Sequence, residues 1–112
     1  MQDYPVKVNN YILDLFFKNP EISPSTYNFS EIGSDALLVL EELQRREGVV
    51  FIISANDSTN NPLWVVGNKA QTMILASKTE GRLPEDGSFA ASAPTFSMAI
   101  CLAALKSLNV KV

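Results

Sequence analysis

The side chains that could carry out chemistry in this chain are few, and histidine is absent from the sequence. Without an imidazole, the chain lacks the usual general base, the commonest metal ligand and every Ser-His or Cys-His arrangement. The single cysteine, Cys101, stands among apolar helical neighbours, where a small core residue is far more common than a nucleophile. A lone cysteine also excludes an intramolecular disulfide.

Acidic and glycine-rich motifs add no catalytic set. Glu85-Asp86 lie in a Pro/Gly loop and Glu41-Glu42 on a polar helix face, so neither pair has the apolar setting that raises a carboxyl pKa. The segment 56–60 alternates oxygen-bearing side chains, but with one carboxylate it is predicted to form a turn rather than a calcium site. No phosphate-binding glycine motif is present. The sequence therefore predicts a protein that is not an enzyme, with no metal site and no cofactor.

Binding is the chemistry that remains, and basic side chains cluster around one loop. Lys69, Lys78 and Arg82 flank a predicted strand at 71–76 and the polar loop 77–91, where they suit the phosphate of a small nucleotide. Asn68 suits a base edge, and Trp64 a stacked ring, although a strand tryptophan more often packs in the core. Helix N-termini bind anions, which makes the first turn of the last helix another candidate. The predicted ligand-binding set is Trp64, Asn68, Lys69, Lys78, Arg82, Ser92 and Thr95.

Three helices are expected to position these residues. In segment 4–19, the face that would be buried carries Val8, Ile12, Leu15 and Phe16. Segment 34–47 has Ser34 as its expected N-cap, Gly48 as its C-cap, and a buried stripe of Ala36, Leu37, Leu40 and Leu43. Its charged side chains form the i,i+4 pairs Glu41–Arg45 and Glu42–Arg46 on what is interpreted as a solvated face. Segment 93–108 is the last helix.

Strands are expected between the second and third helices. The run 49–53 is apolar throughout, which predicts a strand buried on both faces. The turn cluster 56–62 returns the chain as 63–66, which predicts an antiparallel hairpin, and 71–76 supplies a third strand. The expected fold is mixed α/β (α+β): a three-layer α/β/α sandwich with a roughly three-stranded antiparallel sheet.

The length and the net charge of the chain limit the kinds of partner that it can bind. The 112 residues suit one domain, 1–112, and nine basic against twelve acidic side chains give a formal charge of −3. No basic cluster exceeds Arg45-Arg46, which disfavours duplex nucleic acid as a partner. No secretory signal is visible and the longest apolar run is too short to span a membrane, so a cytoplasmic location is expected.

The last helix carries a family resemblance. Ala93-Pro94, followed by Ala99-Ile100-Cys101-Leu102-Ala103-Ala104-Leu105, resembles the "A-P-x-A-I-C-x-A-A-L" ending of the phage ABA sandwich domain family. Trp64 in a mid-chain strand and the Ser34-Asp35-Ala36 helix start support the match. The resemblance implies a phage or prophage origin and the sandwich fold; the family carries no assigned chemistry.

Two functions follow as hypotheses. In the first, the protein is a phage-encoded module that binds and sequesters a host antiviral signalling nucleotide or a small host protein without turning it over. In the second, it is a structural or interaction protein that self-associates through a sheet edge or through the small face formed by Ala99, Ala103 and Ala104. A homo-oligomer, with a dimer as the expected form, fits either hypothesis.

Overall fold

The computed structural model describes residues 4–18, 27–56, 59–68 and 90–110. The elements are the α-helix α1 (Tyr4–Tyr11), the π-helical segment η1 (Ile12–Phe17), α2 (Gly33–Glu47), β1 (Phe51–Asn56), β2 (Pro62–Gly67), β3 (Ala90–Ala93) and α4 (Phe96–Ser107). The strands form an antiparallel sheet in the order β1-β2-β3. The mixed α+β class and the predicted hairpin are therefore confirmed.

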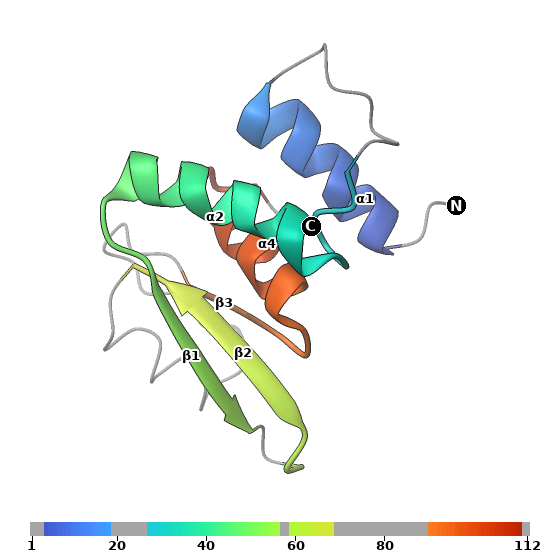
Figure 1. The fold of residues 1–112 in the computed structure, drawn as a ribbon, viewed down its shortest axis with the longest axis vertical. Helices are drawn as coiled ribbons and strands as arrows, with labels where there is room; N and C mark the ends of the chain where they lie inside the picture. Colours follow the sequence, from blue (N-terminus) through green and yellow to red (C-terminus); the bar gives the residue numbers. More distant parts are fainter. Residues whose placement is uncertain (1–3, 19–26, 57–58, 69–89, 111–112) are drawn as a thin grey trace.

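The described helices all lie on one side of the sheet (Figure 1). Helix α4 contacts β2 and β3, while α2, α1 and η1 contact α4 from its other sides. We expected the helices to cover both faces of the sheet; within the described segments, the three predicted helices lie on one face. The reason is that α4 is apolar around most of its circumference, so the other helices pack on it and not on the sheet.

Helix α4 is the centre of the core. Its buried residues are Ser97, Ala99, Ile100, Cys101, Ala103, Ala104 and Leu105. Alanines let the neighbouring elements approach closely, because helix packing distance depends on the side chains at the contact. Leu108, which caps the C-terminal end of the helix, is exposed.

The register of the sheet assigns each residue to one of two faces. Trp64 lies opposite Ala93, and Val66 opposite Ala91; all four belong to the main core beside α4. Val65 and Ala90 are buried on the opposite face, together with partly buried Ile53 and Leu63. The small residues of β3 let α4 lie close against the sheet.

Strand β1 differs from its prediction. The apolar run was expected to be buried on both faces, yet Val49 is 60% exposed and Phe51 41% exposed. Within the described part of the chain, β1 is an edge strand, and α4 packs on β2 and β3 rather than on it. The prediction failed because apolar composition does not reveal whether a strand is central.

The third strand was expected at 71–76, which lies outside the described residues. On the side away from β1, β2 pairs with β3. We had expected the residues of β3 to form the end of a loop and the start of the last helix. Ser92 is consequently a strand residue paired with Val65, not an N-cap. Thr95 caps α4, and its hydroxyl accepts a hydrogen bond from the Met98 N–H at 3.3 Å.

The first helix is interrupted by a change of winding. Segment 4–18 runs as α1 and then as the wider η1, and ends at Lys18 in the left-handed region with φ of 52°. A π-helix turns the chain through a smaller angle per residue than an α-helix, so the buried face drifts along it. Val8, Ile12 and Phe16 are buried as predicted, but Leu13 is buried in place of Leu15, which is exposed.

Helix α2 ends as predicted, but it begins differently. Gly48 terminates it with φ of 87°, a conformation that favours glycine. The N-cap is Ile32, with no side-chain cap, so Ser34 does not have its predicted role. Ala36 and Leu43 are buried and Leu40 is partly buried as predicted, but Leu37 is 46% exposed and Val39 is buried instead. Which residues of α2 are buried therefore depends on the side from which α4 packs against it.

A charged contact fastens α2 to η1. Glu42 pairs with Arg46, as predicted, with Arg46 Nε at 2.9 Å from the carboxylate. Arg46 also donates to the Phe16 carbonyl at 2.5 Å, and its guanidinium lies 4.3 Å from the centre of the Phe16 ring. Arg45 pairs with Glu42 and not with Glu41, which corrects the predicted Glu41–Arg45 pair.

The Glu42 contact predicts a pH dependence of stability. Hydrogen bonds from Arg45 and then Arg46 lower the pKa of Glu42 from about 4.5 to about 2. Because the folded-state pKa is depressed, the stabilisation is complete above about pH 4.5 and is lost as the pH falls toward about 2. We expect Glu42→Gln to lower the free energy of unfolding by about 0.5–1 kcal/mol at neutral pH.

Urea unfolding at several pH values checks this prediction. The difference between wild type and Glu42→Gln should shrink steadily as the pH is lowered from neutral through the acidic range. Glu47→Gln, an exposed position on the same helix, is the control and should show little difference at any pH. A gap between wild type and Glu42→Gln that does not change with pH would contradict the assignment.

The burial of α4 predicts an inert thiol. Cys101 is fully buried, and desolvation raises the pKa of its thiol above the ordinary range. Since the thiolate is the reactive form, a disulfide reagent should label the native protein at least about 100-fold more slowly than the urea-unfolded chain. Comparable labelling rates in the two states would show that α4 is not held in the core as described.

Candidate functional site

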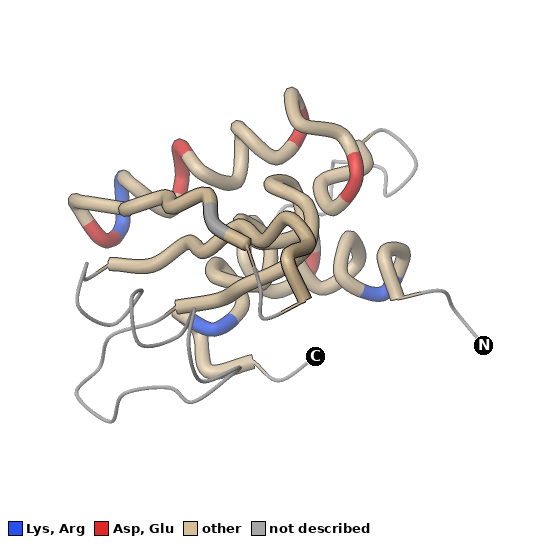
Figure 2. Tube along the Cα trace, turned by 90° about the horizontal axis from the view of Figure 1, so that it is seen from below, with Lys and Arg blue, Asp and Glu red and all other residues tan. Residues whose placement is uncertain are grey.

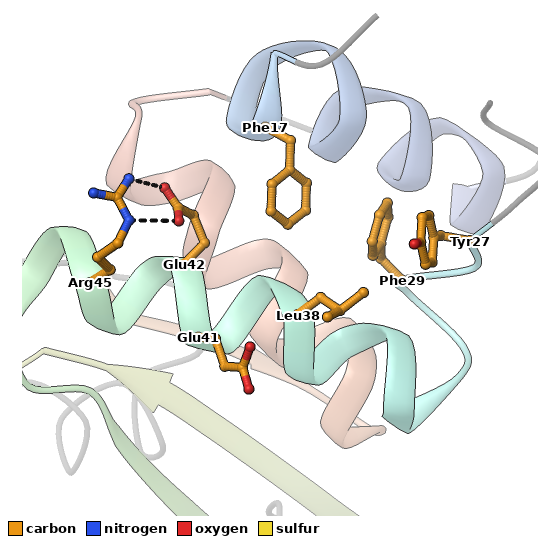
Figure 3. A pocket seen from close by; sticks show the side chains of 7 residues that line it. All are labelled: Phe17, Tyr27, Phe29, Leu38, Glu41, Glu42 and Arg45. Carbon is orange, nitrogen blue, oxygen red and sulfur yellow. Dashed lines mark hydrogen bonds and ion pairs between the residues drawn. The ribbon is translucent and has the colours of Figure 1, made fainter. Parts of the chain in front are cut away.

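An open groove lies between α2, η1 and the segment that precedes α2 (Figure 3). Its volume is about 400 Å³. That volume lies at the small end of the range for ligand sites. The residues that line it are Phe17, Tyr27, Phe29, Leu38, Glu41, Glu42 and Arg45. It combines an apolar, aromatic wall with a charged rim.

Helix α2 supplies one side of the groove through a single stripe. Leu38, Glu41, Glu42 and Arg45 are spaced at i, i+3, i+4 and i+7, which places them in line along one helix face. Leu38 is 40% exposed, so an apolar surface is open to a ligand next to the carboxylates. This stripe lies beside the one that faces α4.

Three aromatic rings form the other side. Tyr27 and Phe29 stack with their ring centres 5.3 Å apart and an angle of 19° between the planes. Phe17, from η1, lies 5.5 Å from Phe29 in a tilted arrangement. Phe29 is buried and forms the base of the wall, whereas Phe17 and Tyr27 are only partly buried.

Polar contacts hold the segment that carries Tyr27 and Phe29. The Asn9 side chain donates to Asn28 at 2.8 Å and accepts from the Ser30 N–H at 2.8 Å. The Ser30 hydroxyl donates to the Pro5 carbonyl at 3.1 Å, and Asp35 accepts from the Asn28 N–H at 2.9 Å. These bonds connect the segment to both α1 and α2, so the aromatic wall is pre-formed.

The two carboxylates of the rim differ in their environment. Glu42 accepts from Arg45 Nε at 2.9 Å and from Arg46, which is why its pKa is low. Glu41 is exposed and makes no hydrogen bond or ion pair with the described residues. Chemically, the groove can stack a planar group against its aromatic side chains, whereas the Glu41 carboxylate points away from the rings (Figure 3). No group of three metal-ligating side chains occurs in the described segments.

The predicted ligand-binding residues do not converge on this groove. Lys69, Lys78 and Arg82 lie outside the described residues. Trp64 packs against Phe96 edge-to-face, with the ring centres 5.5 Å apart and the planes at 74°. It therefore serves the core, the alternative weighed for it above. Asn68 is half-buried just after β2.

The predicted anion site at the start of the last helix is also altered. Ser92 lies opposite Val65, and Trp64 opposite Ala93, so Ser92 and Trp64 are on different faces of the sheet. The helix begins only after Thr95, whose hydroxyl is used in the cap. The structure thus separates Trp64 and Ser92, which the prediction had placed in one site.

Sequence reasoning missed the groove because its residues had other plausible roles. Glu41, Glu42 and Arg45 fit a solvated helix face, and Tyr27 and Phe29 are aromatic residues of a kind that commonly packs in a core. One available signal was Leu38, an apolar residue on the charged side of α2. A second was the density of aromatic residues at 16–17 and 27–29.

The described charged residues are spread over several elements (Figure 2). Lys106, on α4, is half-buried, donates to the Ala90 carbonyl at 3.1 Å, and has its pKa lowered by burial. This hydrogen bond connects α4 to β3. No described helix is both long and apolar enough to cross a membrane.

Comparison with protein-family models gives no match, and comparison with curated proteins gives no significant one. Among solved structures, the chain is similar to a phage protein from Bacillus cereus ATCC 14579, solved at 2.0 Å. The match covers 100% of this chain and 94% of that protein, with 19% sequence identity and a TM-score of 0.63. At this identity the likeness establishes the fold alone: this chain has a fold that is also found in a phage protein, in agreement with the phage part of the resemblance.

Proposed function

We propose that this chain is a non-enzymatic, phage-encoded domain that binds and sequesters a ligand from the host cell. The candidate ligands are a signalling nucleotide of the host's antiviral defence and a host protein. The observation that carries the proposal is the groove of about 400 Å³, which is aromatic on one side and has charged residues of α2 on the other. Pre-formed concave sites with a few polar groups are typical of ligand binding.

Several observations favour binding over catalysis. The sequence has no histidine, and the one cysteine is buried with a raised pKa. Glu42 has a lowered pKa, whereas a general acid at neutral pH needs a raised one. The anti-defence role is proposed by analogy with small phage proteins that counter host defences.

A second candidate function, self-association, has one specific observation in its favour. Phe51 and Ile52 in β1 and Val49 just before it are exposed, and β1 is at the edge of the sheet within the described residues. An uncharged edge strand is a template for pairing with another strand. The small face of α4 is a poorer candidate than expected, because Ala99, Ala103 and Ala104 are buried within one chain. Light scattering measures the oligomeric state directly.

A thermal-shift screen against cyclic and ADP-ribose-type nucleotides tests the nucleotide form of the proposal. A true ligand should raise Tm by several degrees, because a compound that binds only the folded state stabilises it. Tyr27→Ala should abolish the shift by removing part of the stacking wall. The matched control is Tyr4→Ala, an exposed tyrosine on α1 that does not line the groove.

The basic residues predicted from the sequence form a second arm of the same experiment. If Lys78→Ala and Arg82→Ala weaken the shift while Tyr27→Ala does not, the ligand binds elsewhere and the groove is not the site. A flat screen combined with a stable oligomer would overturn the nucleotide form and favour self-association. A flat screen with a monomeric protein would overturn both the nucleotide form and self-association, and would leave a host protein as the candidate ligand.

A further inference from the structure

We propose that two copies of this chain associate through the β1 edge of the sheet, by antiparallel pairing of β1 with β1 of the second copy. The inference gives an interface to the self-association that is the second candidate function, and it does not depend on a ligand in the groove. It follows from the unprotected backbone of the β1 edge, from apolar side chains on both of its faces, and from the symmetry of a strand paired with itself.

The backbone of β1 is paired on one side only within the described residues (Figure 1). On that side, β1 pairs with β2 over six consecutive residues, from Phe51 to Asn56, with no interruption in the register. The strand contains no charged residue, no proline and no bulge, which are the features that commonly keep an edge strand from pairing with another chain. The backbone N–H and C=O groups of this edge therefore suit a second extended strand.

The other edge of the described sheet is less suitable. Strand β3 has four residues, against six in β1. The Ala90 carbonyl of β3 already accepts a hydrogen bond from the Lys106 side chain at 3.1 Å. Helix α4 also packs on β3 and makes no comparable contact with β1. Of the two edges, β1 is the one that offers a long strand to a partner.

Apolar side chains are exposed on both faces of β1. Ile52 lies opposite Val66, which belongs to the core beside α4, so Ile52 is on that face of the sheet, where it is 36% exposed. Phe51 precedes it and therefore lies on the opposite face, where it is 41% exposed. A strand that covers both side chains must be uncharged and apolar on both faces, because a charge placed beside them would lose water without gaining a partner.

A second copy of β1 meets this requirement. Pairing about a two-fold axis perpendicular to the sheet makes the two strands antiparallel and keeps the equivalent faces of the two copies on the same side. Phe51 and Ile53 share one face, so these apolar residues of the two copies meet on one side of the joined sheet, and the two Ile52 side chains approach each other on the other. Because β1 is uncharged, the pairing brings no like charges opposite each other within the strand.

Ser54 provides the test, because it is exposed and lies near the middle of β1. Static light scattering of the wild type should show the mean molar mass rising from one chain toward two as the protein concentration is raised about 100-fold. Ser54→Lys and Ser54→Glu should each weaken the dimer at least about fivefold, because the two-fold axis brings like charges together across the contact. An equimolar mixture of the two variants should restore the dimer, since a mixed pair has opposite charges.

Ser34→Lys and Ser34→Glu are the matched controls, since they place the same charges at an exposed serine in the first turn of α2. They should leave the concentration dependence of the molar mass unchanged. Thermal unfolding at a concentration where the wild type is monomeric should show that all four variants are folded. Recovery of the dimer in the Ser54 mixture would independently exclude a folding defect, because both components must then retain β1.

The outcomes separate this inference from ligand binding. A wild type that remains a single chain over the whole concentration range overturns it, as does a Ser54 mixture that fails to recover or a Ser34 variant that dissociates the dimer equally. The groove lies between α2 and η1, so Ser54→Lys should keep the Tm shift that a groove ligand gives the wild type. Loss of the dimer without loss of that shift, or the reverse, shows which of the two proposals fails.

Discussion

The burial of α4 is the constraint on which the rest of the structure depends. Every other described element except the edge strand β1 makes substantial contact with it, from the sheet on one side and from α1, η1 and α2 on the others. Its alanines and its cysteine are fully buried, so any larger side chain there would have to displace a neighbour. Its contacts on several sides give a physical reason for the many small residues in this segment.

The groove is a consequence of this packing. Since α2 directs Ala36, Val39 and Leu43 toward α4, its neighbouring stripe with Leu38 and Glu41 faces the gap beside η1. The change from α to π winding in the first helix accompanies the placement of Phe16 in the core and Phe17 at the groove. The Glu42–Arg46–Phe16 contact then fixes α2 and η1 relative to each other. Core packing and site geometry are therefore linked through one charged network.

The chemistry of the groove follows from which charges are already paired. Glu42 is committed to two arginines and stabilises the junction of the helices, whereas Glu41, the adjacent residue, is turned to a different environment and is unpaired within the described residues. Two neighbouring carboxylates thus differ in their contacts: Glu42 helps to hold the fold together, and Glu41 makes no bond with the described residues. Their difference arises from tertiary contacts, because both belong to the same charged run of sequence.

The sequence by itself determined the α+β class, the hairpin, the positions of the helices, the end of α2 at Gly48 and the burial of Cys101. These features depend on local signals: apolar periodicity, turn residues and the conformational freedom of glycine. Tertiary structure alone decided that β1 is exposed and that the third described strand is Ala90–Ala93. It also decided that Leu13 and Val39 are buried in the core in place of Leu15 and Leu37. The aromatic groove beside α2 likewise appears only in the folded structure. The physical reason is that burial and charge pairing depend on which element packs on which side, and neighbouring residues in the chain do not carry that information.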